Sequence, residues 1–387
     1  MESIYLDHAA TSPLDPEVVE AMLPYFYEHF GNPSSIHHIG RTSRQVVDAA
    51  RGQIADLLNV KSSELIMTSG GTEADNLAII GYALEHESKG KHIITTATEH
   101  HAVLHACQEL ERRGFDVTYL PVDETGKVRP EEVEAALRGD TILVSIMYGN
   151  NEVGTVQPIQ EIGERLKDHQ AVFHTDAVQA CGLVELDLST LPVDMLSISA
   201  HKINGPKGIG LLYTNQSIKL RPLLFGGEQE RKRRAGTENV ASIIGFAKAM
   251  ELANQSIPEK RERYLSYSRI FFDTFAEANL TFVLNGDPME RLPHVLNVSF
   301  PGVEVEQLLV ALDMARIAAS SGSACSAGSL EPSHVLLAMF GEGQNDRVRS
   351  AVRFSFGVTN TEEQINKSAK EIASIVKRLQ EQQVFIR

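Results

Sequence analysis

A lysine near the middle of the chain follows a run of residues typical of a buried strand. The apolar run over 193–199 ends in Ser199, and Lys202 comes just before a Gly-Pro-Lys-Gly turn at 205–208. In open parallel sheets, ligands bind beyond the carboxyl ends of the strands. An amine at such a position can hold an aldehyde as a Schiff base. A solvated lysine before a turn is the simpler explanation of this segment alone, so the rest of the chain must decide.

Further polar residues stand where other expected strands end. The set comprises Gly70-Gly71-Thr72, His100, Asn150-Asn151, Asp176, Gln179, Ser199 and His201. Each has a simpler explanation when taken alone, such as a tight turn, a helix cap or a strand-end carboxylate. Because the carboxyl ends of parallel strands meet at one edge of a sheet, we expect these side chains to converge.

Together these residues match what a protein must supply to pyridoxal 5'-phosphate. Lys202 would hold the aldehyde, Asp176 would keep the ring nitrogen protonated, and Gln179 would donate a hydrogen bond to the ring oxygen. His100 would stack on the ring. Backbone N–H groups at a helix N-terminus and nearby side chains would bind the phosphate: Gly71, Thr72, Ser199 and His201. The coincidence is more specific than any one member of the set.

The elements that would position these residues alternate between strand and helix. Strands are expected at 64–68, 92–96, 117–121, 142–147, 171–175 and 195–199. Helices are expected at 17–30, 40–58, 73–84, 101–112, 131–137 and 159–167. This alternation predicts an α/β fold with a mostly parallel sheet flanked by helices.

The pattern changes beyond about residue 251. The chain there carries a long amphipathic segment, a short strand-like run and two further helices, at 260–278, 295–300, 305–312 and 362–382. We therefore expect a large cofactor-binding domain at 12–255 and a smaller α+β domain formed by 1–11 and 256–387.

The net charge of -15 argues against a nucleic-acid-binding protein, which needs a basic surface to neutralise phosphates. A basic stretch at 231–234 is the one local exception, and the sequence assigns it no role. No apolar run is long enough to cross a membrane. The first residues do not have the pattern of a secretory signal, so a cytoplasmic location is expected.

Three widely spaced cysteines predict neither a disulfide framework nor a metal site within the chain. Cys325 lies among small residues at 320–329, where it is either an incidental thiol on a surface loop or a nucleophile on a mobile mount. An exposed thiol is easily oxidised, which favours a use for it. Cys107 and Cys181 are expected to be inert packing.

Motifs spread over nearly the whole chain indicate a resemblance to a known protein family. They lie at 5–11, 31–35, 68–73, 98–100, 174–179, 199–202, 236–237, 321–325, 330–333 and 353–355. With them the sequence resembles the cysteine desulfurases, pyridoxal-phosphate enzymes of aminotransferase class V, in the branch with a long catalytic-cysteine loop. The resemblance implies the fold-type-I transferase architecture and a homodimer.

The resemblance also implies roles for individual residues. Lys202, Cys325 and His100 are the catalytic residues, with His100 as the partner for proton transfers. Cys325 sits on a loop at about 318–332. Thr237 would reach the phosphate across the dimer interface. Asn151 would contact the cofactor, and three residues would contact the substrate carboxylate: Asn32, Asn151 and Arg353.

The expected reaction converts L-cysteine to L-alanine and leaves a persulfide on Cys325. The sulfur then passes to an acceptor protein for iron–sulfur cluster assembly or tRNA thiolation, and Cys325 would meet a metal cluster only transiently, on a scaffold partner. The sequence does not choose the acceptor, nor cysteine over selenocysteine. Alternatives are another fold-type-I enzyme, such as an aminotransferase or a selenocysteine lyase, or a non-catalytic scaffold. Retention of both Lys202 and Cys325 counts against the scaffold.

Overall fold

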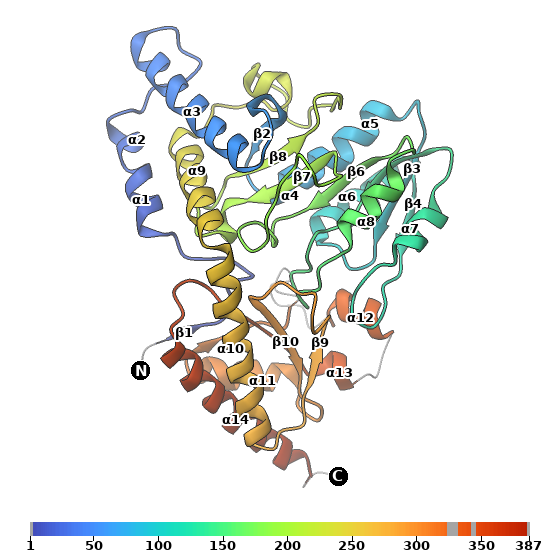
Figure 1. Ribbon diagram of the computed structural model, residues 1–387, viewed down its shortest axis with the longest axis vertical. Coiled ribbons are helices and arrows are strands. Elements are labelled where there is room, and N and C mark those ends of the chain that lie inside the picture. Colours follow the sequence, from blue (N-terminus) through green and yellow to red (C-terminus); the bar gives the residue numbers. More distant parts are fainter. Residues whose placement is uncertain (1–2, 323–331, 342–345, 385–387) are drawn as a thin grey trace.

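A seven-stranded sheet forms the centre of the upper part of the molecule in Figure 1. The computed structural model describes residues 3–322, 332–341 and 346–384. The strand order is β2-β8-β7-β6-β5-β3-β4. The strands are β2 (Leu65–Thr68), β3 (His92–Thr96), β4 (Asp116–Leu120), β5 (Thr141–Ser145), β6 (Val172–Asp176), β7 (Met195–Ser199) and β8 (Gly210–Thr214). Only β8 runs against the others in this sheet, so the predicted mostly parallel α/β architecture is confirmed.

Helices cover both faces of this sheet. They are α1 (Pro16–Met22), α2 (Pro24–Tyr27), α3 (His38–Leu57), α4 (Gly71–Asn76), α5 (Tyr82–His86), α6 (His101–Arg112), α7 (Pro130–Ala136), α8 (Ile159–Leu166) and α9 (Val240–Gln255). A π-helical turn, Leu77–Gly81, joins α4 to α5. The expected helix at 17–30 is two helices, because Pro24 has no N–H to continue the first.

Alternate residues of each strand enter different cores, as the period of two in a strand requires. Leu196 and Ile198 of β7 pack in one cluster with residues of α3, α8 and α9. Met195 of the same strand packs in another with residues of α4 and α6. Both faces of the sheet are therefore buried, which explains why the central strands carry long apolar runs.

The lower part of the molecule has its own sheet and its own core. An antiparallel sheet of order β12-β10-β9 and a parallel pair β1-β11 pack against three helices. The elements are β1 (Ile4–Tyr5), β9 (Val283–Asn285), β10 (Val295–Ser299), β11 (Ile317–Ala318), β12 (Ala351–Ser355), α10 (Ile257–Glu277), α11 (Val305–Met314) and α14 (Glu362–Val384). The short helices α12 (His334–Phe340) and α13 (Asp346–Arg349) lie at its side (Figure 1). Helix α10 connects the two parts (Figure 1).

The first residues of the chain belong to the lower part. Ile4 and Leu6 pack in its core, and Ile4 pairs with Ile317 of β11. The backbone then passes the carboxyl ends of the central strands at residues 7–12 on its way to α1. None of the described helices is both long and apolar enough to span a membrane.

Candidate active site

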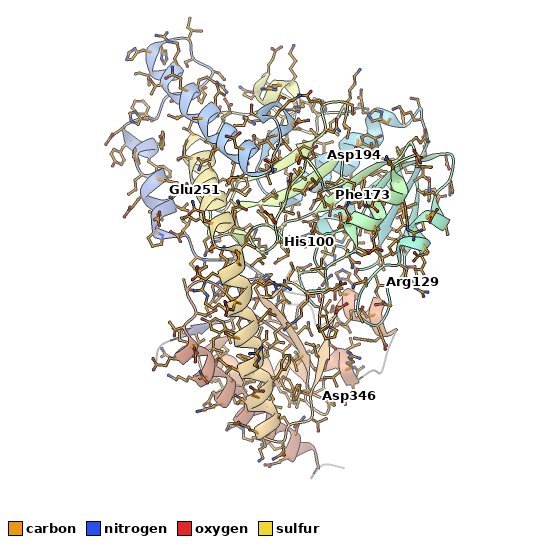
Figure 2. All side chains as sticks on the ribbon, in the orientation of Figure 1. His100, Arg129, Phe173, Asp194, Glu251 and Asp346 are labelled. Carbon is orange, nitrogen blue, oxygen red and sulfur yellow. The ribbon has the colours of Figure 1, made fainter. Side chains whose placement is uncertain are left out.

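A cavity of about 330 Å³ lies where the strand ends of the central sheet face the lower part of the molecule. Most of the predicted residues line it: Gly71, Thr72, His100, Asn151, Asp176, Gln179, Ser199, His201, Lys202 and Arg353. Figure 2 draws the side chains on the ribbon and labels His100, one of these lining residues, where the upper and lower parts of the molecule meet. The central sheet and the lower part of the molecule therefore bring together residues that are far apart in the chain, from Gly71 after β2 to Arg353 on β12.

Five of the predicted residues are not in this lining. Gly70 precedes the lining residue Gly71, and Asn150 is buried beside the cavity, where its amide donates to the backbone oxygen of Thr98 at 3.0 Å. Asn32 is exposed, and its side-chain oxygen accepts the N–H of Ser34 at 2.9 Å. Thr237 is also exposed. Cys325 lies outside the described residues, although Gly322, just before it in the chain, lines the cavity.

Lys202 is carried into the cavity by a short 3-10 turn, Ala200–Lys202, that follows β7 directly. Its Nζ donates hydrogen bonds to the carbonyl oxygens of Ala9 and Ala10, the latter at 2.7 Å. These carbonyls come from the N-terminal segment that crosses the strand ends. Two backbone acceptors thus hold the amine in place without neutralising its charge.

Asp176 ends β6 and is almost fully buried. One carboxylate oxygen accepts the N–H of Val178 at 2.8 Å. Burial raises the pKa of Asp176 to about 6, and the Val178 N–H and the charge of Lys202 oppose that rise. A buried carboxyl of this kind suits a cationic partner, because an opposite charge restores the stability of its ionised form.

His100 is both the N-cap of α6 and part of the cavity wall. Its Nδ1 accepts the N–H of Ala102 at 3.1 Å, so the neutral ring carries its proton on Nε2. Burial, assisted by Lys202 and neighbouring histidines, lowers the pKa of His100 to about 4. The imidazole is therefore a neutral hydrogen-bond donor at neutral pH.

The end of the cavity near α4 has the features of an anion site. Gly70 adopts a φ of 150°, and a Cβ on Gly71 would meet Val178 at 2.8 Å, so backbone occupies this position with no room for a side chain. The hydroxyl of Ser199 is buried and has no hydrogen-bond partner among the described residues. The ring nitrogen Nδ1 of His201 lies 3.2 Å from the hydroxyl oxygen of Thr11. An anion with several oxygens would satisfy such donors.

Arg353 reaches the cavity from β12 and is only 2% exposed. Its guanidinium donates to the backbone oxygen of Asn151 and to the carboxylate of Asp7, both at 2.8 Å. Its Nε has no partner among the described residues. A guanidinium has five N–H donors, so several remain for a further acceptor in the cavity.

Gln179 is fixed by two contacts. Its amide nitrogen donates to Ala9 at 2.9 Å, and its amide oxygen faces Nε2 of His294 at 3.2 Å. One amide hydrogen is left for a further acceptor, and Gln179 lines the cavity.

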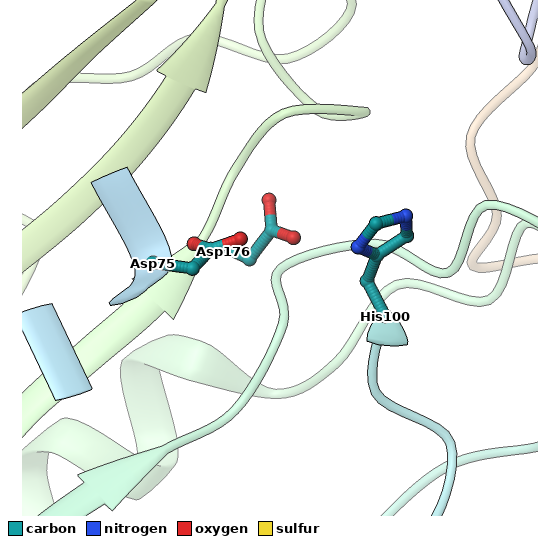
Figure 3. A group of neighbouring side chains, drawn as sticks. All are labelled: Asp75, His100 and Asp176. Carbon is teal, nitrogen blue, oxygen red and sulfur yellow. The ribbon is translucent and has the colours of Figure 1, made fainter. Parts of the chain in front are cut away.

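Sequence reasoning missed two acidic residues at this site. Asp75 lines the cavity from α4, and its ligand atoms lie within 4.8 Å of those of His100 and Asp176. Figure 3 shows the three side chains, from α4, the start of α6 and the end of β6, reaching into one space. The helical spacing from Thr72 to Asp75 could have indicated Asp75. No local signal indicated the pairing of Asp7 with Arg353.

Comparisons with known proteins agree with this geometry. Residues 4–367 match the family model described as Aminotransferase class-V. The chain is 61% identical over 379 residues to "Putative cysteine desulfurase IscS 1" of Bacillus subtilis (strain 168), covering 98% of this chain and 100% of the relative.

Two solved structures share the fold over most of both chains. A "NIFS-LIKE PROTEIN" has a TM-score of 0.91 and 36% identity, with 97% of this chain and 100% of that one covered. "SspA in complex with cysteine" has a TM-score of 0.79 and 36% identity, with coverages of 92% and 99%.

Proposed function

This chain belongs to the aminotransferase class-V family and is a cysteine desulfurase, and from this premise we propose how its residues hold the cofactor and carry the sulfur. The observation that carries the proposal is that Lys202 and Asp176 both line one cavity, at the ends of adjacent strands. An amine for an aldehyde and a buried carboxylate for a ring nitrogen are the two groups that pyridoxal phosphate most needs.

The cavity fits pyridoxal 5'-phosphate on grounds of its own donors. The Ser199 hydroxyl, which no described residue pairs with, and the glycine backbone before α4 suit the phosphate, together with Thr72 and His201. Lys202 would hold the aldehyde, and Asp176 the ring nitrogen. When bound, the cofactor supplies an electron sink for bonds broken at the α-carbon of the substrate.

The residues around that carbon bind the substrate and move its proton. Arg353 binds the carboxylate of L-cysteine, helped by Asn151 beside it. Asn32 is exposed and outside the lining of this cavity, so its help would come from a second copy of the chain. Lys202 Nζ takes up the α-proton. His100, neutral with its proton on Nε2, donates that proton at the reacting sulfur or ring.

Cys325 takes the sulfur. Its thiolate attacks the substrate sulfur, so a sulfur–sulfur bond forms as the carbon–sulfur bond of L-cysteine breaks. The electron pair stays with the substrate carbon, which gains a proton and leaves as L-alanine. Cys325 keeps a persulfide. Cys325 is outside the described residues, and support for its access comes from Gly322, which lines the cavity close to it in the chain.

A sulfur-acceptor protein and a second copy of this chain are the proposed macromolecular partners. Acceptors of the iron–sulfur scaffold or tRNA-thiolating kind fit a sulfur carried on a protein thiol. The division into 12–255 and 1–11 with 256–387 remains our proposal, and the separate cores of the two parts favour it. A cytoplasmic location remains a prediction.

Two substitutions test the chemistry. Lys202→Ala should abolish alanine formation and the absorbance of the lysine-bound cofactor, because no other lysine lines the cavity among the described residues. Cys325→Ser should keep the cofactor absorbance and stop sulfur transfer. Lys207→Ala, an exposed lysine five residues on, should change neither and is the control.

The product measured should be L-alanine together with acceptor-bound sulfur. An aminotransferase would give a 2-oxo acid from L-cysteine instead. Normal turnover of L-cysteine to alanine by Cys325→Ser, with a physiological acceptor present, would falsify the persulfide step.

A further inference from the structure

Asp75 is a second acid in the cavity, and no step above uses it. Its side chain is 1% exposed, and its carboxyl lies within 4.8 Å of the carboxyl of Asp176 (Figure 3). Its oxygen Oδ1 has no hydrogen-bond partner among the described residues. Two carboxylates so close together and away from water repel strongly, because the low dielectric hardly screens them. The pair must therefore hold at least one proton at a pH where isolated carboxyls hold none.

The surroundings of the two carboxyls decide which one is ionised. Asp176 accepts a backbone N–H at 2.8 Å and feels the positive charge of Lys202, and both favour its carboxylate form. Asp75 accepts a hydrogen bond from the hydroxyl of Ser197, but burial and the negative charge of Asp176 oppose its ionisation. The proton therefore resides on Asp75.

The nearby histidines do not supply a compensating charge. Nε2 of His174 is 3.7 Å from Asp75, but the ring is wholly buried and its pKa is lowered to about 3. Its two nitrogens face the hydroxyls of Ser145 and Ser197, at 2.8 and 3.0 Å, which a neutral ring satisfies. His100, on the cavity side, is neutral as well.

We propose that Asp75 is a positioning residue that keeps a proton at neutral pH, so that the acid pair presents one negative charge, on Asp176, to the ring nitrogen of the cofactor. The part about the ring nitrogen rests on the proposed function, whereas the proton on Asp75 does not. A second ionised carboxyl would leave a buried charge without a partner, which is costly. Burial and the neighbouring carboxylates raise the pKa of Asp75 well above its usual range, in agreement with this assignment.

Infrared difference spectra test the proton directly. The full-length protein as purified, with its bound cofactor, is compared at neutral pH with Asp75→Asn. The variant should lose one carbonyl band of a protonated carboxylic acid. Asp123→Asn is the control, because hydrogen bonds to Asp123 lower the pKa of that carboxyl and it should contribute no such band. An unchanged acid band in Asp75→Asn would overturn the proposal.

Thermal unfolding between about pH 5 and about pH 8 tests the same proton by linkage. A group whose folded-state pKa is raised stabilises the fold fully below its unfolded pKa, and that stability is lost as pH rises towards the folded pKa. Asparagine does not titrate, so the Asp75→Asn variant does not lose stability in this way as the pH rises. The unfolding midpoint of the variant minus that of the wild type should therefore increase with pH.

A constant difference across this range would mean that Asp75 has only a packing role, and would refute the proposal. The two hypotheses fail separately. If the wild-type protein forms no alanine from L-cysteine while Asp75→Asn still loses the acid band, the proposed function is wrong and the proton on Asp75 stands.

Discussion

Single residues at this site are held by partners that also limit what they can do. Arg353 pairs with Asp7 at 2.8 Å and with a backbone oxygen at the same distance, so its guanidinium plane is fixed before any substrate arrives. His100 caps α6 through Nδ1, which fixes the tautomer that faces the cavity. Orientation of this kind lowers the entropy lost when substrate binds.

The fixed plane of Arg353 predicts a specific loss on replacement by lysine. Arg353→Lys keeps the charge but cannot make two parallel hydrogen bonds to a carboxylate. A charge-assisted hydrogen bond contributes about 1.5–3 kcal/mol, so KM for L-cysteine should rise by about 10- to 100-fold, with a smaller change in kcat. Arg349→Lys, an exposed arginine four residues earlier, should leave KM unchanged in the same assay.

The low pKa of His100 predicts its behaviour in a pH profile. A histidine whose pKa is lowered to about 4 gains charge only below that pH, so it stays neutral over the working range. His100→Gln should lower kcat by about 100-fold or more through the lost proton donor. The acidic limb of the profile above about pH 5 should keep its position. A shift of that limb in His100→Gln, absent in His101→Gln, would contradict the neutral ring.

At the scale of elements, the segment after β8 is held against α3 by buried charge. Glu230 is 7% exposed and makes two hydrogen bonds with Arg51 of α3, at 2.6 and 2.9 Å. Glu230, Arg231 and Lys232 have φ of 46°, 57° and 69°, a left-handed run that is unfavourable for residues other than glycine. The ion pair offsets the strain of this turn.

Removing the acid of this pair should be costly. Glu230→Gln leaves Arg51 buried without its counter-charge, and loss of one partner of a buried pair costs about 3–5 kcal/mol in the free energy of unfolding. Glu228→Gln is the matched control, since Glu228 pairs with Lys232 on the surface and such pairs contribute about 0–1 kcal/mol. Urea unfolding monitored by circular dichroism measures both. Equal losses in the two variants would argue against the anchoring role of Glu230.

The sequence predicted elements best where a period was visible. The strands at 92–96 and 195–199 and the helix at 101–112 match β3, β7 and α6. Helix α9 was not predicted, because it is buried on nearly every side and so lacks an amphipathic stripe. Strand β8 was not predicted either. It follows a glycine-rich turn and pairs antiparallel with β7, which interrupts the alternation of strand and helix on which the prediction depended.

The same reasoning explains what could be predicted of the site. The carboxyl ends of parallel strands lie at the same edge of a sheet, so the residues that follow them converge. The alternation of strands and helices in the sequence predicts such a sheet. Asp75 was missed because it stands inside a helix, and its burial depends on packing against β7 and β8. The contact of Asp7 with Arg353 spans 346 positions and depends on the lower sheet, so no spacing rule predicts it.

At the scale of the whole molecule, the cavity lies between two separately packed parts, and several large apolar side chains of the upper part remain exposed. Two large apolar side chains, Leu224 and Phe225, are exposed after β8. The others lie along the first helices and their connections: Leu14, Val19, Leu23, Phe26, Tyr27, Phe30, Ile36 and Ile39. Extended exposed apolar surfaces in proteins mark interaction sites. The exposed residues Asn32 and Thr237 belong to the same stretches of chain, which is the placement expected if they serve a cavity in a second copy.

A homodimer that buries these exposed apolar side chains is therefore predicted, and Phe225→Glu should break it. Phe225 is 82% exposed in the single chain, and a charge there would remain buried and unpaired in the dimer. Met314→Glu is the control, because Met314 is equally exposed, at 82%, but lies on α11 in the lower part. Light scattering should give a dimer for the wild type and for Met314→Glu, and a monomer for Phe225→Glu. Because Thr237 would then be missing from the neighbouring cavity, the monomer should also release pyridoxal phosphate more readily, which dialysis followed by absorbance measures. A Phe225→Glu protein that stays dimeric would place the interface elsewhere, and a monomer that keeps its cofactor as tightly as the wild type would remove Thr237 from the phosphate site.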